Sequence, residues 1–225
     1  MNKSFATILI VLFALSPVVF FLMAWNSFPQ RIVVHFAINK EFENIQTKKE
    51  LFSAITVIAS LAVLVYLILV SIHKVDPKVT DETPRTAFNK LGAMLCLFLT
   101  VLNYYLLLTV KNQWTINTNV LIGFTGLMVC LIGNYMNNIR PNYITGIRLP
   151  WTLNDPENWR KTHHLASRMW FIAGILILIF SFWISEKILL PIMIAAIIII
   201  TVIPGIYSFK IYRSQKIKPP HLQNR

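Results

Sequence analysis

Long apolar stretches alternate with short polar segments along the whole chain. Six of these stretches contain no Asp, Glu, Lys or Arg. A helix needs about 20 residues, with a range of roughly 17 to 25, to cross the hydrocarbon core of a bilayer, so the pattern predicts six membrane-spanning helices. The fifth stretch is at the short limit, and its helix is expected to begin inside the preceding loop. The stretches are Phe5–Trp25, Leu51–Ile72, Leu91–Val110, Asn119–Asn137, Met169–Ser185 and Ile188–Phe209.

The composition agrees with this pattern. Hydrophobic residues make up 56% of the 225 residues and charged residues only 13%, whereas an average soluble domain has about 25% charged residues. The sequence therefore predicts an all-α, multi-pass protein of the cell membrane, built as a bundle of six transmembrane helices. The first stretch is expected to stay as a helix, because its apolar run is longer than that of a secretory signal peptide.

The positive charges are distributed unevenly among the loops. Lys and Arg number 15 in the N-terminus, residues 73–90, residues 138–168 and the C-terminal tail, but 6 in the segments on the other side. Because short loops rich in Lys and Arg stay in the cytoplasm, both termini are predicted to be cytoplasmic and residues 26–50 external. The net charge of +12 then mainly reflects the topology of the chain, and it also attracts the protein to anionic lipids of the bilayer. Direct binding of nucleic acid is not expected.

The loops divide the chain into four parts. Residues 1–72 hold the first two spans with the external loop 26–50, and residues 73–137 hold spans three and four. Residues 138–168 form the predicted cytoplasmic loop, which we call the signature loop. Residues 169–225 hold the last two spans and a basic tail.

The fourth span is the most polar of the six. On a helical wheel its small and amide residues share one face, and large apolar residues occupy the opposite face. One interpretation is a close-packed face inside the bundle, where small residues let helices approach and amides find partners. The other is a polar ligand cavity lined by Asn134 and Asn137. The shared face consists of Gly123, Gly126, Cys130, Gly133, Asn134 and Asn137.

The signature loop contains a helix start. Asp155 followed by Pro156 combines an N-cap acceptor with proline at the first helical position. The residues that follow predict a short amphipathic helix at the cytoplasmic interface that runs into the fifth span. It would be either a membrane anchor or a docking surface for a cytosolic partner. Its cationic face consists of Arg160, Lys161, His164 and Arg168, and its other face of Trp159, His163, Ala166, Met169 and Trp170.

The chain contains none of the common catalytic or metal-binding motifs. HExxH, CxxC, GxSxG and phosphate-binding loops are absent. The adjacent His163 and His164 would point about 100° apart on a helix, which does not suit a shared metal ion. No catalytic residue, cofactor or metal is therefore expected, and a membrane-bound hydrolase that uses His163 is kept only as a third hypothesis. His163 is expected either to hydrogen-bond to the backbone or to carry a proton.

Three runs of residues resemble the SdpI family of bacterial immunity proteins. They are Gly133–Met136, Arg140–Leu153 and Trp159–His163, which are similar to the family patterns GN-x-M, PN-x-x-x-GIRTPWTL and VWRKTHR. A weaker similarity covers Phe28–Phe36, which is expected to form a strand or a short surface element. The departures from the family patterns are Leu149, where Thr is usual, and His164, where Arg is common.

The resemblance implies a six-helix bacterial membrane protein that protects its producer against a secreted toxic peptide. The family's best-known member also holds a cytosolic transcriptional repressor at the membrane while the toxin is bound. The peptide would be met outside, at residues 26–50 and the outer mouth of the bundle, and a repressor at the cytoplasmic face. The alternative function is a small transporter or exporter with a polar cavity in the bundle. The residues expected to form or brace these faces are Asn134, Asn137, Asn142, Arg148, Trp151, Trp159, Arg160 and His163.

Overall fold

The protein has six long apolar helices. The computed structural model describes residues 3–35, 43–79, 85–114 and 116–217. Within these residues six helices are long and apolar enough to cross a membrane, which confirms the predicted spans, and the protein is a multi-pass membrane protein. The helices are α1 (Lys3–Met23), α2 (Lys48–Val70), α4 (Arg85–Lys111), α5 (Thr118–Met136), α7 (Pro156–Phe180) and α8 (Glu186–Ile217).

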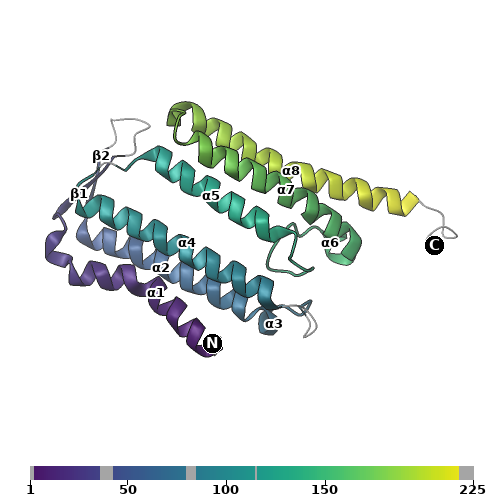
Figure 1. The fold of residues 1–225 in the computed structure, drawn as a ribbon, viewed down its shortest axis with the longest axis horizontal. Coiled ribbons are helices and arrows are strands. Elements are labelled where there is room, and N and C mark those ends of the chain that lie inside the picture. The colour runs from purple at the N-terminus through teal and green to yellow at the C-terminus, as the bar shows by residue number, and fades with distance from the viewer. Residues whose placement is uncertain (1–2, 36–42, 80–84, 115, 218–225) are drawn as a thin grey trace.

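The spans form two groups of three (Figure 1). Helices α1, α2 and α4 pack against one another, and α5, α7 and α8 form the second group. A β-hairpin lies at one end of the bundle, which we call the hairpin end. The short helices α3 (Ile72–Val75) and α6 (Pro150–Asn154) lie at the opposite, signature end.

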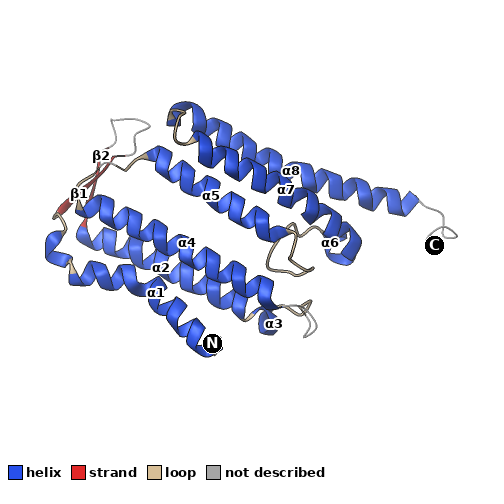
Figure 2. Cartoon of the chain, in the orientation of Figure 1, coloured by secondary structure: helices blue, strands red, loops and turns tan. Residues whose placement is uncertain are grey.

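The hairpin connects α1 and α2 and adds a pair of short strands to the expected helical bundle (Figure 2). After the 3-10 turn η1 (Trp25–Ser27), strand β1 (Arg31–His35) pairs antiparallel with β2 (Glu43–Thr47). β1 lies within the segment for which a strand was one of two predicted forms, and its run of β-branched residues favours that form. Phe28 and Ile32 are buried beneath the hairpin at the ends of the first three spans, in a cluster with Phe21, Leu51, Ile55, Leu107 and Val110.

The fifth span begins earlier than the apolar pattern indicates. α7 starts at the predicted position, where the Asp155 side chain accepts a hydrogen bond from the Glu157 amide at 2.9 Å and Pro156 follows the cap. The helix then continues without a break to Phe180. An amphipathic helix running into the fifth span was predicted. In the structure its residues are the first turns of α7, whose aromatic face is covered by protein at Trp159 and His163.

The two groups of helices meet at both ends. At the hairpin end, the ring of Phe124 in α5 contacts Phe98 and Tyr105 of α4 at centroid distances of 5.9 and 5.6 Å. At the signature end, a buried cluster joins side chains from both groups. Its members are Leu69, Ile72, Val79, Phe88, Leu91, Ile139 and Trp159.

A cysteine-labelling experiment tests the predicted orientation. Ser27 at the hairpin end and Tyr143 at the signature end are both exposed, so a cysteine at either position would react wherever the reagent reaches it. With Cys96 and Cys130 replaced by alanine, we expect Ser27→Cys to react with an impermeant maleimide in intact cells. Tyr143→Cys should react only after permeabilisation, because the cytoplasmic side carries most of the Lys and Arg. The opposite pattern would overturn the orientation.

Candidate functional site

The small-residue face of α5 packs directly on α7. A Cβ atom added at Gly126 would lie 2.6 Å from the backbone nitrogen of Leu178, and one added at Gly133 would lie 2.5 Å from that of Phe171. Such distances mean that the two backbones are in contact, as small residues allow between membrane helices. The close-packed interpretation of this face is therefore correct for its glycines.

The signature loop is folded around a buried asparagine. The Asn142 side chain is fully buried, and its Oδ1 accepts hydrogen bonds from the amides of Ile144 at 2.9 Å and Thr145 at 2.6 Å. Its Nδ2 donates to the Arg140 carbonyl at 2.8 Å. An asparagine that binds its own backbone in this way fixes a turn, so Asn142 braces the loop rather than facing a ligand.

The same loop closes onto α7 through His163. The Ile147 amide donates to His163 Nε2 at 3.0 Å, and His163 Nδ1 lies 2.9 Å from the Trp159 carbonyl oxygen. Because Nε2 accepts, the single ring proton of a neutral imidazole sits on Nδ1 and is donated to that carbonyl. His163 is 1% exposed. The neutral His163 ring thus holds the signature loop against α7. This confirms the expectation that His163 hydrogen-bonds to the backbone.

Gly146 makes this closure sterically feasible. Its φ of 92° lies in the left-handed region that residues with a Cβ avoid. A Cβ at this position would also overlap with Nε2 of His163 and would lie 3.3 Å from the Trp159 ring. The family pattern contains glycine here, but the contact with His163 is visible only in three dimensions.

Trp159 joins the signature loop to the first group of helices. Its ring stacks on His163 with a centroid distance of 4.0 Å and an interplanar angle of 17°. Its Nε1 donates to the Ile139 carbonyl at 2.8 Å, and the side chain is 2% exposed. The aromatic face of α7 is therefore part of the protein interior at this level, not a lipid anchor.

A hydrogen-bond network ties α6 and α7 to α8. Trp151 Nε1 donates to Ser208 Oγ at 2.7 Å, and Ser208 Oγ donates to Asn158 Oδ1 at 3.1 Å. Asn158 Nδ2 donates to the Ser208 carbonyl at 3.1 Å, while Thr162 Oγ1 donates to Asn158 Oδ1 at 3.0 Å. The Trp151 ring also stacks on Tyr212. Through Ser208, Trp151 belongs to a network that joins α6, α7 and α8. The sequence analysis did not identify Asn158 or Ser208 as part of this network.

Asp76 is a further residue that sequence reasoning missed. Its carboxylate is 2% exposed and accepts hydrogen bonds from the amides of Lys78 at 2.9 Å and Tyr143 at 2.5 Å. Lys78 Nζ donates to the Leu153 carbonyl. The loop after α3 is therefore bound to the signature loop, and an acidic residue just before Pro77 was the only available signal.

A polar hollow of about 750 Å³ opens beside the start of α7 at the signature end. Arg160 on its wall is exposed and forms two 2.8 Å hydrogen bonds with Glu157. Asn137 Oδ1 lies 3.1 Å from His164 Nδ1, while Asn134 is exposed one turn earlier on α5. Arg148 is exposed and donates to the Tyr143 carbonyl at 2.5 Å. The polar residues that line the hollow include Asn137, Asn138, Arg140, Glu157, Arg160 and His164.

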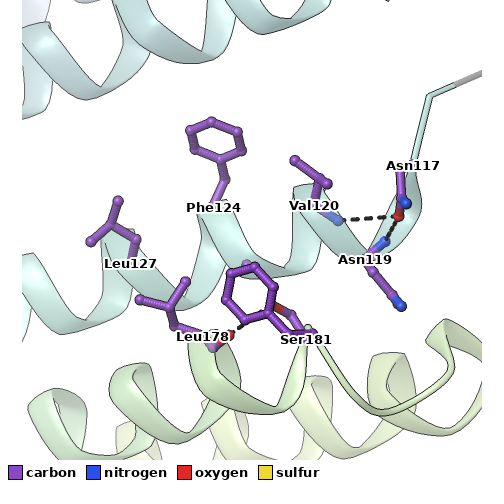
Figure 3. Close-up of a pocket in the computed structure, with 9 residues that line it drawn as sticks. Asn117, Asn119, Val120, Phe124, Leu127, Leu178 and Ser181 are labelled. Carbon is purple, nitrogen blue, oxygen red and sulfur yellow. Dashed lines mark hydrogen bonds between the residues drawn. The ribbon is translucent and has the colours of Figure 1, made fainter. Parts of the chain in front are cut away.

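A second pocket, largely apolar and about 390 Å³ in volume, lies between α5 and α7 at the hairpin end (Figure 3). Phe124, Leu178 and Phe182 contribute to its walls. Asn119 lies at its rim and donates from Nδ2 to the Ile184 carbonyl at 3.2 Å, while its Oδ1 is buried without a partner among the described residues. The protein therefore carries a polar recess at one end and an apolar recess at the other.

Within residues 3–35, 43–79, 85–114 and 116–217, no group of three or more His, Cys, Asp or Glu side chains converges as metal ligands would. His163, the residue on which a hydrolase would depend, has both ring nitrogens engaged with the backbone. The His163 ring therefore holds the signature loop against α7.

Comparison with known proteins points to a family. Residues 138–208 match the model of the SdpI/YfhL protein family. This segment contains the whole signature loop, α6, α7 and α8 as far as Ser208. A second model, the Uncharacterised protein family (UPF0014), matches residues 49–144.

A curated relative agrees with the first match. Immunity protein SdpI of Bacillus subtilis (strain 168) is 31% identical to this chain over 107 residues, which are 47% of this chain and 51% of that protein. The chain thus spans about half the length of the curated relative that it matches. No solved structure matches the chain. The family match and this relative confirm the resemblance found in the sequence.

Proposed function

We propose that this protein protects the cell that makes it against a secreted toxic peptide. The observation that carries the proposal is the match to the SdpI/YfhL family over residues 138–208, together with 31% identity to a protein named as an immunity protein. The hydrogen bonds of Asn142 and His163 lie within that segment and support the proposal, because they fix the fold of the matched loop. The glycine contacts hold α5 and α7 together at Gly126 and Gly133. The pocket that remains between these helices is largely apolar, unlike the polar cavity of the alternative function.

The proposed encounter with the peptide takes place at the hairpin end. Trp114, Phe182 and Trp183 are 66%, 74% and 76% exposed there, and exposed aromatic side chains are typical of the membrane–water interface. A toxic peptide that acts on membranes would collect in this layer. The apolar pocket beside Phe182 offers it a recess on the same surface.

The proposed cytosolic partner, a transcriptional repressor, docks at the signature-end hollow. The hollow presents Arg140, Arg160 and His164 on a rigid base, and arginine is among the residues that most often dominate interfaces. A surface that is formed before binding loses little entropy on docking. The cluster around Trp159 links this surface to α2 and α4, whose other ends lie near the hairpin.

A sensitisation experiment tests immunity. The gene is deleted in the producing organism, and growth is followed after addition of cell-free medium from a wild-type culture. We expect the mutant to stop growing and the full-length chain, supplied on a plasmid, to restore growth. The medium from a strain that lacks secreted peptides serves as control. A deletion mutant that grows as well as wild type in this medium would refute the proposal.

Partner docking is tested separately from immunity. We expect Arg140→Ala combined with Arg160→Ala to reduce recruitment of a cytosolic partner at least about tenfold, because truncation of an interface arginine commonly costs about 2 kcal/mol. Protection should persist. Recruitment is measured by fluorescence of the tagged partner at the membrane. Lys49→Ala combined with Lys187→Ala at the hairpin end, where both lysines are exposed, is the charge-matched control. Trp151 is unsuited to this test because its removal would also disturb Ser208 and Tyr212. Undiminished recruitment would exclude the hollow.

A further inference from the structure

A stripe of cations on α7 runs beside an exposed aliphatic face of α8. Arg160, Lys161, His164 and Arg168 are all exposed. Together with Leu165 and Tyr207 they line a groove of about 360 Å³ between the two helices. On α8, Val202, Ile203 and Ile206 are 48%, 42% and 52% exposed.

Two hydrogen bonds fix the level of this stripe against α8. Asn158 Nδ2 donates to the Ser208 carbonyl at 3.1 Å, and Trp170 Nε1 donates to the Ile200 carbonyl at 3.1 Å. Every cation of the stripe lies between Asn158 and Trp170 in the sequence of α7. The stripe therefore lies alongside residues 200–208 of α8.

Those residues of α8 belong to its membrane span. The uncharged stretch Ile188–Phe209 is about 33 Å long as a helix, at 1.5 Å per residue, which is close to the roughly 30 Å thickness of the hydrocarbon core. Residues 200–208 then extend through most of the hydrocarbon of one leaflet, at the signature end. The cations are thus held at the level of this hydrocarbon, where an unpaired charge is costly.

The described part of the chain neutralises this charge only in part. The Glu157 carboxylate pairs with Arg160 at 2.8 Å and Lys161 at 3.3 Å, and within the described ranges no carboxylate pairs with Arg168. Snorkelling toward water would bring Arg168 closer to Arg160 and Lys161, which carry the same sign of charge. An anion that is not part of the chain would reduce the repulsion between these cations. It would also reduce the free-energy cost of holding them at the level of the hydrocarbon.

We propose that this groove binds the headgroup of an anionic phospholipid. The phosphate accepts hydrogen bonds from Arg168 and Lys161, and the acyl chains lie on the exposed face formed by Val202, Ile203 and Ile206. The exposed aliphatic side chains at this level of α8 favour a phospholipid over a soluble anion or an acidic protein segment, because acyl chains can cover them. The site shares Arg160 and His164 with the proposed docking hollow, but Lys161 and Arg168 line only the groove.

Lipid titration of the purified full-length protein tests this proposal. Thermal unfolding in a neutral detergent is followed with added dioleoylphosphatidylglycerol, dioleoylphosphatidylcholine or inorganic phosphate, and native mass spectrometry gives the apparent Kd. We expect phosphatidylglycerol to raise the Tm and one molecule to stay bound, with no such effect from the other two. Arg168→Gln should weaken phosphatidylglycerol binding about tenfold, as loss of a charge-assisted hydrogen bond does, and Arg168→Lys much less.

The control removes the same charge elsewhere. Lys187 is an exposed cation at the hairpin end, and Lys187→Gln should bind phosphatidylglycerol like wild type. An equal loss in Lys187→Gln would show attraction to net charge and overturn the site. Equal stabilisation by inorganic phosphate or by phosphatidylcholine would also overturn it. Lys161→Gln provides a second variant that answers the question even if Arg168→Gln fails to fold.

Discussion

Replacing Gly174 by alanine is expected to separate α5 from α7 and to destabilise the protein by about 3 kcal/mol, the upper range for an overpacked interior. A Cβ at Gly174 would lie 2.6 Å from the Cα of Cys130 and within contact of its backbone nitrogen. Backbone atoms cannot rotate away as a flexible side chain can. The only relief is movement of one helix, which would also break the contacts of Gly126 and Gly133.

Two other glycines provide a graded control for this prediction. Gly205 in α8 has no atom within 4 Å of an added Cβ, and Gly92 in α4 has Leu69 Cβ at 3.1 Å. Gly205→Ala should leave the Tm unchanged or raise it slightly, because alanine favours a helix over glycine. Gly92→Ala should fall between Gly205→Ala and Gly174→Ala. The measurement is thermal unfolding of each purified variant in detergent, and similar Tm values for all three would contradict the close approach of α5 and α7.

The spans could be predicted from sequence because their signal is local. An uncharged apolar run of about 20 residues matches the thickness of the hydrocarbon core and is longer than most core helices or strands of soluble domains. The Asp155–Pro156 pair marks the start of α7 through interactions with its own next turn. The hairpin was only one of two options for Phe28–Phe36, because strand pairing depends on β2, a separate segment farther along the chain.

The covering of α7 could not be predicted in the same way. An amphipathic pattern at Trp159 and His163 shows that one face avoids water, but it does not show whether lipid, a partner or a distant loop covers that face. The structure places residues 139–147 there, held by the bonds to Trp159 and His163. The residues of the predicted amphipathic helix are therefore the first turns of α7, and Trp159 and His163 contact the signature loop.

The candidate site residues separate by burial. Asn142, Trp159 and His163 are buried, and Trp151 is partly buried, so these four hold the signature loop together. The others remain available to a ligand or partner, and their part in binding stays a prediction. Those exposed residues are Asn134, Asn137, Arg148 and Arg160. The roles of Asp76, Asn158 and Ser208 could not be predicted, because each side chain hydrogen-bonds to a residue far away in the sequence.

Replacing Gly146 by alanine should open the signature loop and destabilise it by about 3 kcal/mol. A residue with a Cβ at a φ of 92° costs roughly 1–2 kcal/mol. The added Cβ would also overlap with Nε2 of His163, which forces the Ile147 amide away and leaves a buried acceptor unpaired at a cost of about 1–3 kcal/mol. We expect a lower Tm and loss of partner recruitment.

A double-mutant cycle separates the two causes. Once His163→Ala has removed the ring, Gly146→Ala should cost only the backbone strain, so the two substitutions should be less than additive by about 1 kcal/mol or more. Gly146→Asn relieves part of the strain, because asparagine tolerates positive φ, but it keeps the overlap and should remain destabilising beside His163. Full additivity of Gly146→Ala and His163→Ala would show that the loop does not rest on His163. Thermal unfolding of the four proteins in one detergent measures the coupling, and Gly205→Ala again shows the effect of an added methyl group where there is space for it.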